Sequence, residues 1–113
     1  MFITAMALNV GRSRRNRTLA LDLFYFVKVV FILEPPVDPD GQHVPIEADG
    51  WELFSFVKGS GVEVFVRAQV CGLCDVVGHG DGSARVGYWE DGERRVLAGV
   101  YFPPTHTKAI YTA

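Results

Sequence analysis

The side chains with the clearest capacity for chemistry are two cysteines and a histidine in the second half of the chain. Cys71 and Cys74 are separated by two residues, and His79 follows after four more, which gives the spacing Cys-x2-Cys-x4-His. Thiolate sulfur and imidazole nitrogen are ligands that zinc prefers, and a structural zinc ion takes four ligands in a tetrahedron. The pattern therefore indicates a zinc site that lacks one ligand.

This spacing resembles the retroviral-type zinc knuckle over residues 71–84, including Gly78 directly before the histidine. The knuckle has a further cysteine after four more residues, where this chain has Ala84. The resemblance implies a small zinc-stabilised module that binds nucleic acid. Because structural zinc needs a closed set of ligands, Asp81, His106 or a partner chain would have to complete the site.

Two other interpretations of the cysteines stay open. On a straight strand Cys71 and Cys74 would point to opposite faces, about 10 Å apart, so that they can share an ion only if the chain turns at Gly72. The simplest interpretation is two small buried side chains in or beside a strand, followed by a glycine-rich loop and with no cofactor. Redox chemistry is the third interpretation, although no strand-to-helix unit follows the pair as in thioredoxin-like sites.

No catalytic residue is predicted. All three histidines, His43, His79 and His106, lie near predicted loops, and nothing in the sequence directs a carboxylate or a nucleophile toward any of them. Ser60 lies in a short loop and lacks the spacing of a nucleophile elbow. A non-enzymatic protein is therefore the better prediction.

Positive charge is concentrated near the start of the chain. Four of the eleven lysines and arginines fall close together with no carboxylate among them: Arg12, Arg14, Arg15 and Arg17. We therefore predict that residues 11–18 form a basic flexible arm or turn that can contact nucleic acid or an anionic membrane. The rest of the chain has seven positive and thirteen negative residues, which argues against a broad nucleic-acid surface.

The basic segment and the apolar residues 19–33 resemble a twin-arginine export signal only in part. Asp22 and Lys28 interrupt the apolar run, and no small-residue cleavage site precedes residues 34–36. The run is also too short and too charged to span a bilayer as a helix. We expect a cytoplasmic protein without a membrane span, which also fits two closely spaced cysteines that form no disulfide framework.

Alternation of apolar and polar residues predicts strands through most of the chain. It is clearest in residues 62–70, where every second side chain is apolar. Residues 21–33 are apolar at every odd position and predict a long central strand. Residues 34–50 contain four prolines and predict a long connection. Residues 51–57 and 62–70 form a predicted hairpin with a four-residue loop.

A second hairpin joins residues 84–90 to residues 93–102. Its two-residue loop, Asp91-Gly92, suits the positive φ angles of a type I′ turn. The loop fixes a register in which Trp89 lies opposite Arg94, so that the ring and the guanidinium can stack. We regard both as candidate binding residues, together with the four arginines of the arm.

Two apolar surfaces of the predicted strands must be buried by other residues or by a partner. Phe65 shares the polar face of strand 62–70 with charged residues, so we expect it to be exposed or covered by a partner, and we count it as a candidate binding residue. The strand predicted at 21–33 is apolar on both faces. A small sandwich has little material to cover a second face, which favours burial between subunits.

These patterns predict one all-β domain over residues 1–113, an antiparallel sandwich or partly open barrel of about six or seven strands. An α+β domain is the alternative if residues 34–50 or the N-terminus contain a helix. The predicted function is binding or assembly without catalysis, with a protein partner and self-association through a sheet face or edge. A zinc-stabilised nucleic-acid-binding module and a small β-barrel enzyme or ligand carrier are the alternatives.

Overall fold

The computed structural model describes residues 3–24, 26–46, 48–78 and 82–101 of the 113-residue chain. Seven strands and two helices make up this described part. In chain order they are β1 (Ala5–Asn9), α1 (Arg14–Leu23), β2 (Val29–Leu33), β3 (Trp51–Phe56), β4 (Val62–Arg67), the 3-10 helix η1 (Ala68–Leu73), β5 (Cys74–Gly78), β6 (Ser83–Glu90) and β7 (Glu93–Val100).

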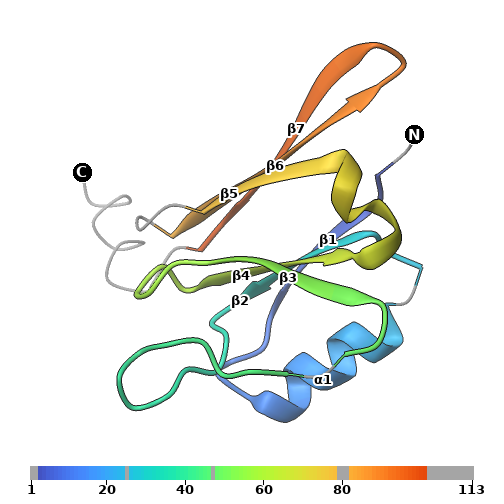
Figure 1. Ribbon diagram of the computed structural model, residues 1–113. Helices are drawn as coiled ribbons and strands as arrows, with labels where there is room; N and C mark the ends of the chain where they lie inside the picture. Colours follow the sequence, from blue (N-terminus) through green and yellow to red (C-terminus); the bar gives the residue numbers. More distant parts are fainter. Residues whose placement is uncertain (1–2, 25, 47, 79–81, 102–113) are drawn as a thin grey trace, which may run out of the picture.

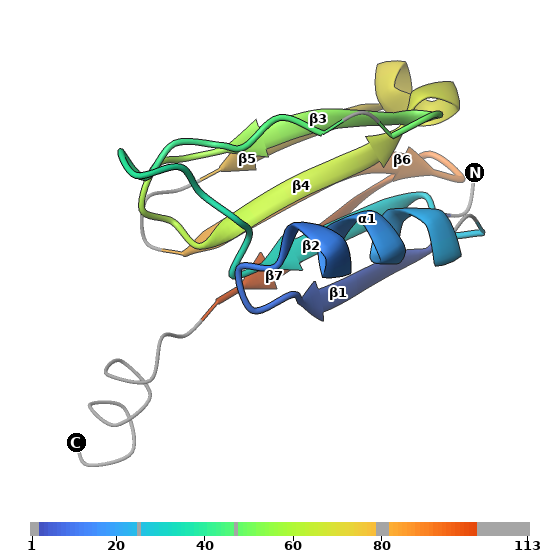
Figure 2. The same cartoon turned by 90° about the horizontal axis from the view of Figure 1, so that it is seen from below.

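The strands form two sheets that pack face to face. The first sheet has the order β1-β2-β4-β3, and the second has the order β5-β6-β7. Figure 1 shows α1 below the first sheet and the second sheet above it, and Figure 2 shows α1 in front of the first sheet with β6 and β7 behind. The predicted β-rich fold class is confirmed, with a helix in the N-terminal half.

One strand pair departs from the predicted antiparallel arrangement. Strands β1 and β2 are parallel, and α1 lies in the connection between them. Parallel neighbours need such a crossover, because a tight turn can join only antiparallel strands. Ser13 starts the helix, since its hydroxyl accepts a hydrogen bond from the backbone N–H of Asn16 at 3.0 Å.

The prediction of a basic arm over residues 11–18 is wrong for most of its length. Only Gly11 and Arg12 form a turn, and both have positive φ angles. Residues 14–18 belong to α1. The segment is ordered by the serine cap and by the helix face that packs on the sheet.

The prediction of one strand over residues 21–33 is also wrong. Helix α1 continues to Leu23, and β structure begins only at Val29. The helix buries Ala20 and Leu21 side by side on the face toward the sheet. Some of the odd-numbered apolar residues of this segment lie in the helix and others lie in β2. Alternation alone does not distinguish the two elements.

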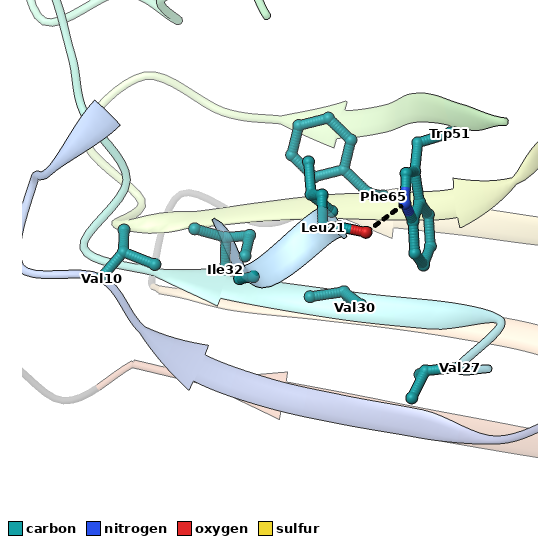
Figure 3. Packing of buried hydrophobic residues seen from close by; sticks show 8 residues of the cluster. Val10, Leu21, Val27, Val30, Ile32, Trp51 and Phe65 are labelled. Carbon is teal, nitrogen blue, oxygen red and sulfur yellow. Dashed lines mark hydrogen bonds between the residues drawn. The ribbon is translucent and has the colours of Figure 1, made fainter. Parts of the chain in front are cut away.

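Both faces of the central strands of the first sheet, β2 and β4, are covered. On the side of α1, Val30 and Ile32 from β2 and Phe65 from β4 pack with Leu21 of the helix (Figure 3). The Trp51 indole N–H donates a hydrogen bond to the Leu21 carbonyl oxygen at 3.0 Å. Phe65 is therefore buried, which corrects the expectation of an exposed ring. The second apolar face of β2 is covered by the chain itself and not by a second subunit.

The other face of the first sheet packs on the second sheet. Valines of β4 and Phe31 of β2 meet Ala84 and Val86 of β6 in one buried cluster. Gly99 of β7 lies against the Phe31 ring, where an added Cβ would be 2.3 Å from Phe31 Cδ1. The missing side chain at position 99 lets β7 pack closely over β2.

The second hairpin has the predicted geometry. Asp91 and Gly92 both have positive φ angles, 52° and 79°, as a type I′ turn requires. Trp89 pairs with Arg94, and Val86 pairs with Leu97, as the loop length predicts. The turn end of this hairpin extends away from the first sheet (Figure 1).

The connection over residues 34–50 is long, as predicted, and the two hairpin strands β3 and β4 follow it. Val44 is buried, and Ile46 and Ala48 pack on the same cluster as α1. Within the ranges that the structure describes, no helix is long and apolar enough to cross a membrane.

Candidate functional site

The second sheet presents an open face on the side away from the first sheet, here called the outer face. Alternate residues of its three strands point there and are exposed, apart from a central glycine. They are Asp75 and Val77 of β5, Arg85, Gly87 and Trp89 of β6, and Arg94, Val96, Ala98 and Val100 of β7. The described part of this face has large apolar side chains in the open, with Trp89 61% and Val96 56% exposed.

Arg94 lies across this face from one edge strand to the other. It starts on β7, and its Nη2 donates hydrogen bonds to both carboxylate oxygens of Asp75 on β5, each at 2.7 Å. Between them lies Gly87 of β6, where a Cβ would come within 2.0 Å of Arg94 Nη2. The glycine therefore makes the path of the guanidinium possible.

Trp89 and Arg94 interact as the predicted register implies. The guanidinium carbon lies 5.9 Å from the centroid of the Trp89 ring, at the outer limit of a cation–π contact. Asp75, Val77, Arg85, Gly87, Arg94 and Val96 line a shallow depression beside the ring. A fixed arginine next to an exposed aromatic ring is typical of binding surfaces, where both residue types are enriched.

The four arginines expected to act together are separated by the fold. Arg12, Arg14 and Arg15 are exposed at the start of α1. Arg17 is 1% exposed, and its Nη1 donates to both carboxylate oxygens of Glu63, at 3.1 and 3.0 Å. Arg17 is therefore removed from the candidate binding residues. Contact of the other three with nucleic acid stays a prediction.

Glu63 is the centre of a buried ionic cluster, here called the Arg17–Glu63–His43 cluster. The carboxylate is fully buried, and its Oε2 also accepts a hydrogen bond from Nδ1 of His43, whose ring packs near Phe56. The cluster ties α1, β4 and the 34–50 connection together. A buried carboxylate needs such partners, because an unpaired charge in the interior is strongly unfavourable.

The contact with the Glu63 carboxylate orients the His43 ring. Because a carboxylate can only accept a hydrogen bond, Nδ1 of His43 must carry the proton. Such a histidine could serve as a base or a metal ligand if further groups were near. Within the described ranges, no three histidine, cysteine or acidic side chains gather as a metal site would require. The geometry supports a structural role for this cluster.

The predicted zinc residues are only partly described. Cys71 lies in η1, Cys74 is the first residue of β5, and both are free and half-buried. His79, Asp81 and His106 lie outside the described residues. Burial is the main cause that raises the pKa of the Cys74 thiol, and the nearby Asp75 and Cys71 add to it. The chain does turn between the cysteines, as a shared role would need.

Sequence reasoning missed Asp75, Gly87 and Glu63, and it named His43 only as a histidine near a predicted loop. The first two could have been found by pairing residues 74–78 with the second hairpin, since Asp75 and Gly87 are neighbours in that register. No local signal indicates that Glu63 is buried, because its partners are 46 and 20 residues away in the chain.

Comparisons with models of protein families, with curated proteins and with solved structures find no match to this chain, so the proposed function depends on its own geometry.

Proposed function

We propose that this protein is a non-enzymatic binding and assembly module that self-associates through the outer face of its second sheet. The observation that carries the proposal is that the first sheet is packed more completely against the rest of the chain than the second sheet is. Among the described residues, the central strands β2 and β4 of the first sheet are packed on both faces against other parts of the chain, whereas the outer face keeps Trp89, Val77 and Val96 exposed. Apolar side chains grouped in this way favour burial against a partner.

A second copy of the chain suits the chemistry of this face. Two-fold association buries the same surface on both copies, so the surface must complement itself. The outer face combines apolar side chains with both signs of charge. Arg85 has no ion pair within the described residues and can approach Asp75 of the other copy. Arg94 is held in place before association, so little side-chain entropy is lost there.

Sedimentation equilibrium over a wide range of protein concentration tests this proposal. We expect the mass of the unaltered chain to rise with concentration toward that of a dimer. Trp89→Ser removes the exposed aromatic side chain of the outer face and should weaken the dimer by about 2 kcal/mol, roughly thirtyfold in Kd.

Leu23→Ser is the matched control, because Leu23 is 64% exposed but lies at the end of α1, on the opposite side of the first sheet. It should leave the dimer unchanged. A chain that stays monomeric at every concentration, or a Leu23→Ser effect as large as that of Trp89→Ser, would contradict the proposal.

A further inference from the structure

The two cysteines are brought to one side of the chain by a local turn that the strand pattern did not predict. Helix η1 covers Ala68–Leu73, so Cys71 lies inside it and Cys74 follows its last residue. Residues 71–73 are helical, and the rise of about 2.0 Å per residue in a 3-10 helix places the Cα atoms of Cys71 and Cys74 about 6 Å apart. Disulfide-bonded residues have Cα atoms about 4.4 to 6.8 Å apart.

The surroundings of the pair are also compatible with a bond between the two sulfur atoms. Both cysteines pack against the cluster between the two sheets, so their side chains share one environment. Cys71 is among the causes that raise the pKa of Cys74, which places the two thiols within electrostatic range. Gly72 between them is exposed, and its Cβ position has no neighbour within 4 Å, so the backbone has room to adjust.

We propose that Cys71 and Cys74 are a reversible redox site that forms an intramolecular disulfide by exchange with a small-molecule disulfide such as oxidised glutathione. One cysteine thiolate attacks a sulfur of oxidised glutathione, which forms a mixed disulfide and releases one reduced glutathione. The thiolate of the second cysteine attacks the protein sulfur of that mixed disulfide and releases the second. The cysteine pair loses two protons and two electrons, and one glutathione disulfide becomes two thiols.

This proposal concerns the corner between β4 and β5 and does not depend on the self-association proposed above.

The test is to incubate the folded full chain with oxidised glutathione, alkylate the remaining thiols and measure the intact mass. We expect an internal disulfide with no glutathione retained. Cys71→Ser and Cys74→Ser, with folding checked by circular dichroism, should each retain one glutathione, because the second thiol that would release it is missing.

A second measurement needs no variant. The equilibrium constant of the unaltered chain with glutathione should be about tenfold larger in the folded state than in denaturant, equivalent to about 30 mV in reduction potential. The proposal is overturned if the folded chain keeps two free thiols, retains glutathione or cross-links to another chain. Equal constants in the folded and denatured states would also overturn it, because the turn would then not position the pair.

Discussion

Both sheets of this protein contain strands with apolar side chains, but the two sheets have different surroundings. In β2 and β4 nearly every residue is buried, including the charged Glu63, because α1 and the 34–50 connection cover the side away from the second sheet. In β6 buried and exposed residues largely alternate, and β7 is mostly exposed. Alternation in the sequence therefore identified β4 as a strand but did not reveal that its polar face is covered.

The largest difference should come from introducing the same charge into each sheet. Val66 of β4 is 0% exposed and lies between the sheets, whereas Val96 of β7 lies on the outer face. Val66→Asp buries an unpaired carboxylate and should lower the free energy of unfolding by more than about 4 kcal/mol, enough to prevent folding. Val96→Asp should change it by no more than about 1 kcal/mol.

Circular dichroism and thermal melting of the two variants measure this difference. A cooperatively folded Val66→Asp protein would mean that this face of β4 is not part of the core. A Val96→Asp protein that fails to fold would mean that the outer face is not open.

The next effect separates the buried and exposed arginines of α1. Arg17→Ala leaves Glu63 without its main counter-charge and should destabilise the fold by about 3–5 kcal/mol, because one member of a buried pair then stays unpaired. Arg14→Ala, three residues away on the exposed side, should change stability by less than about 0.5 kcal/mol.

Urea unfolding provides both values. Replacing the pair together, as Arg17→Met with Glu63→Leu, should recover most of the loss, since an apolar pair avoids the desolvation of two charges. If Arg17→Ala and Arg14→Ala proved equally mild, the buried cluster would be absent in solution.

A smaller effect distinguishes two glycines of the second sheet. A Cβ at Gly99 would meet the buried Phe31 ring, and Gly99→Ala should destabilise the protein by about 1–3 kcal/mol through overpacking. A Cβ at Gly87 would meet the end of the Arg94 side chain, which can move away. Gly87→Ala should cost less than about 1 kcal/mol, the usual worth of an exposed ion pair.

The melting temperatures of the two alanine variants, measured side by side, show which substitution destabilises the protein more. The reverse ranking would place the closer packing on the outer side of the sheet and contradict the arrangement described here.

The parts of the fold set by local signals could be predicted from the sequence. The Asp91-Gly92 turn fixed the pairing of Trp89 with Arg94, because a two-residue loop leaves one register. Helix α1 was missed, since its buried residues run directly into the apolar residues that precede β2. The outer face was only partly predicted, because Asp75 reaches Arg94 through a strand pairing that no turn specifies.

The most direct test of the outer face uses the two tryptophans as internal probes. Trp51 is 9% exposed in the core between α1 and the first sheet, and Trp89 is 61% exposed on the outer face. With both labelled as 5-fluorotryptophan and assigned with a Trp89→Phe variant, fluorine NMR reports each ring separately. We predict that the Trp89 resonance shifts with protein concentration while that of Trp51 stays fixed. A Trp89 resonance that does not move over a range in which the protein dimerises would contradict association through the outer face.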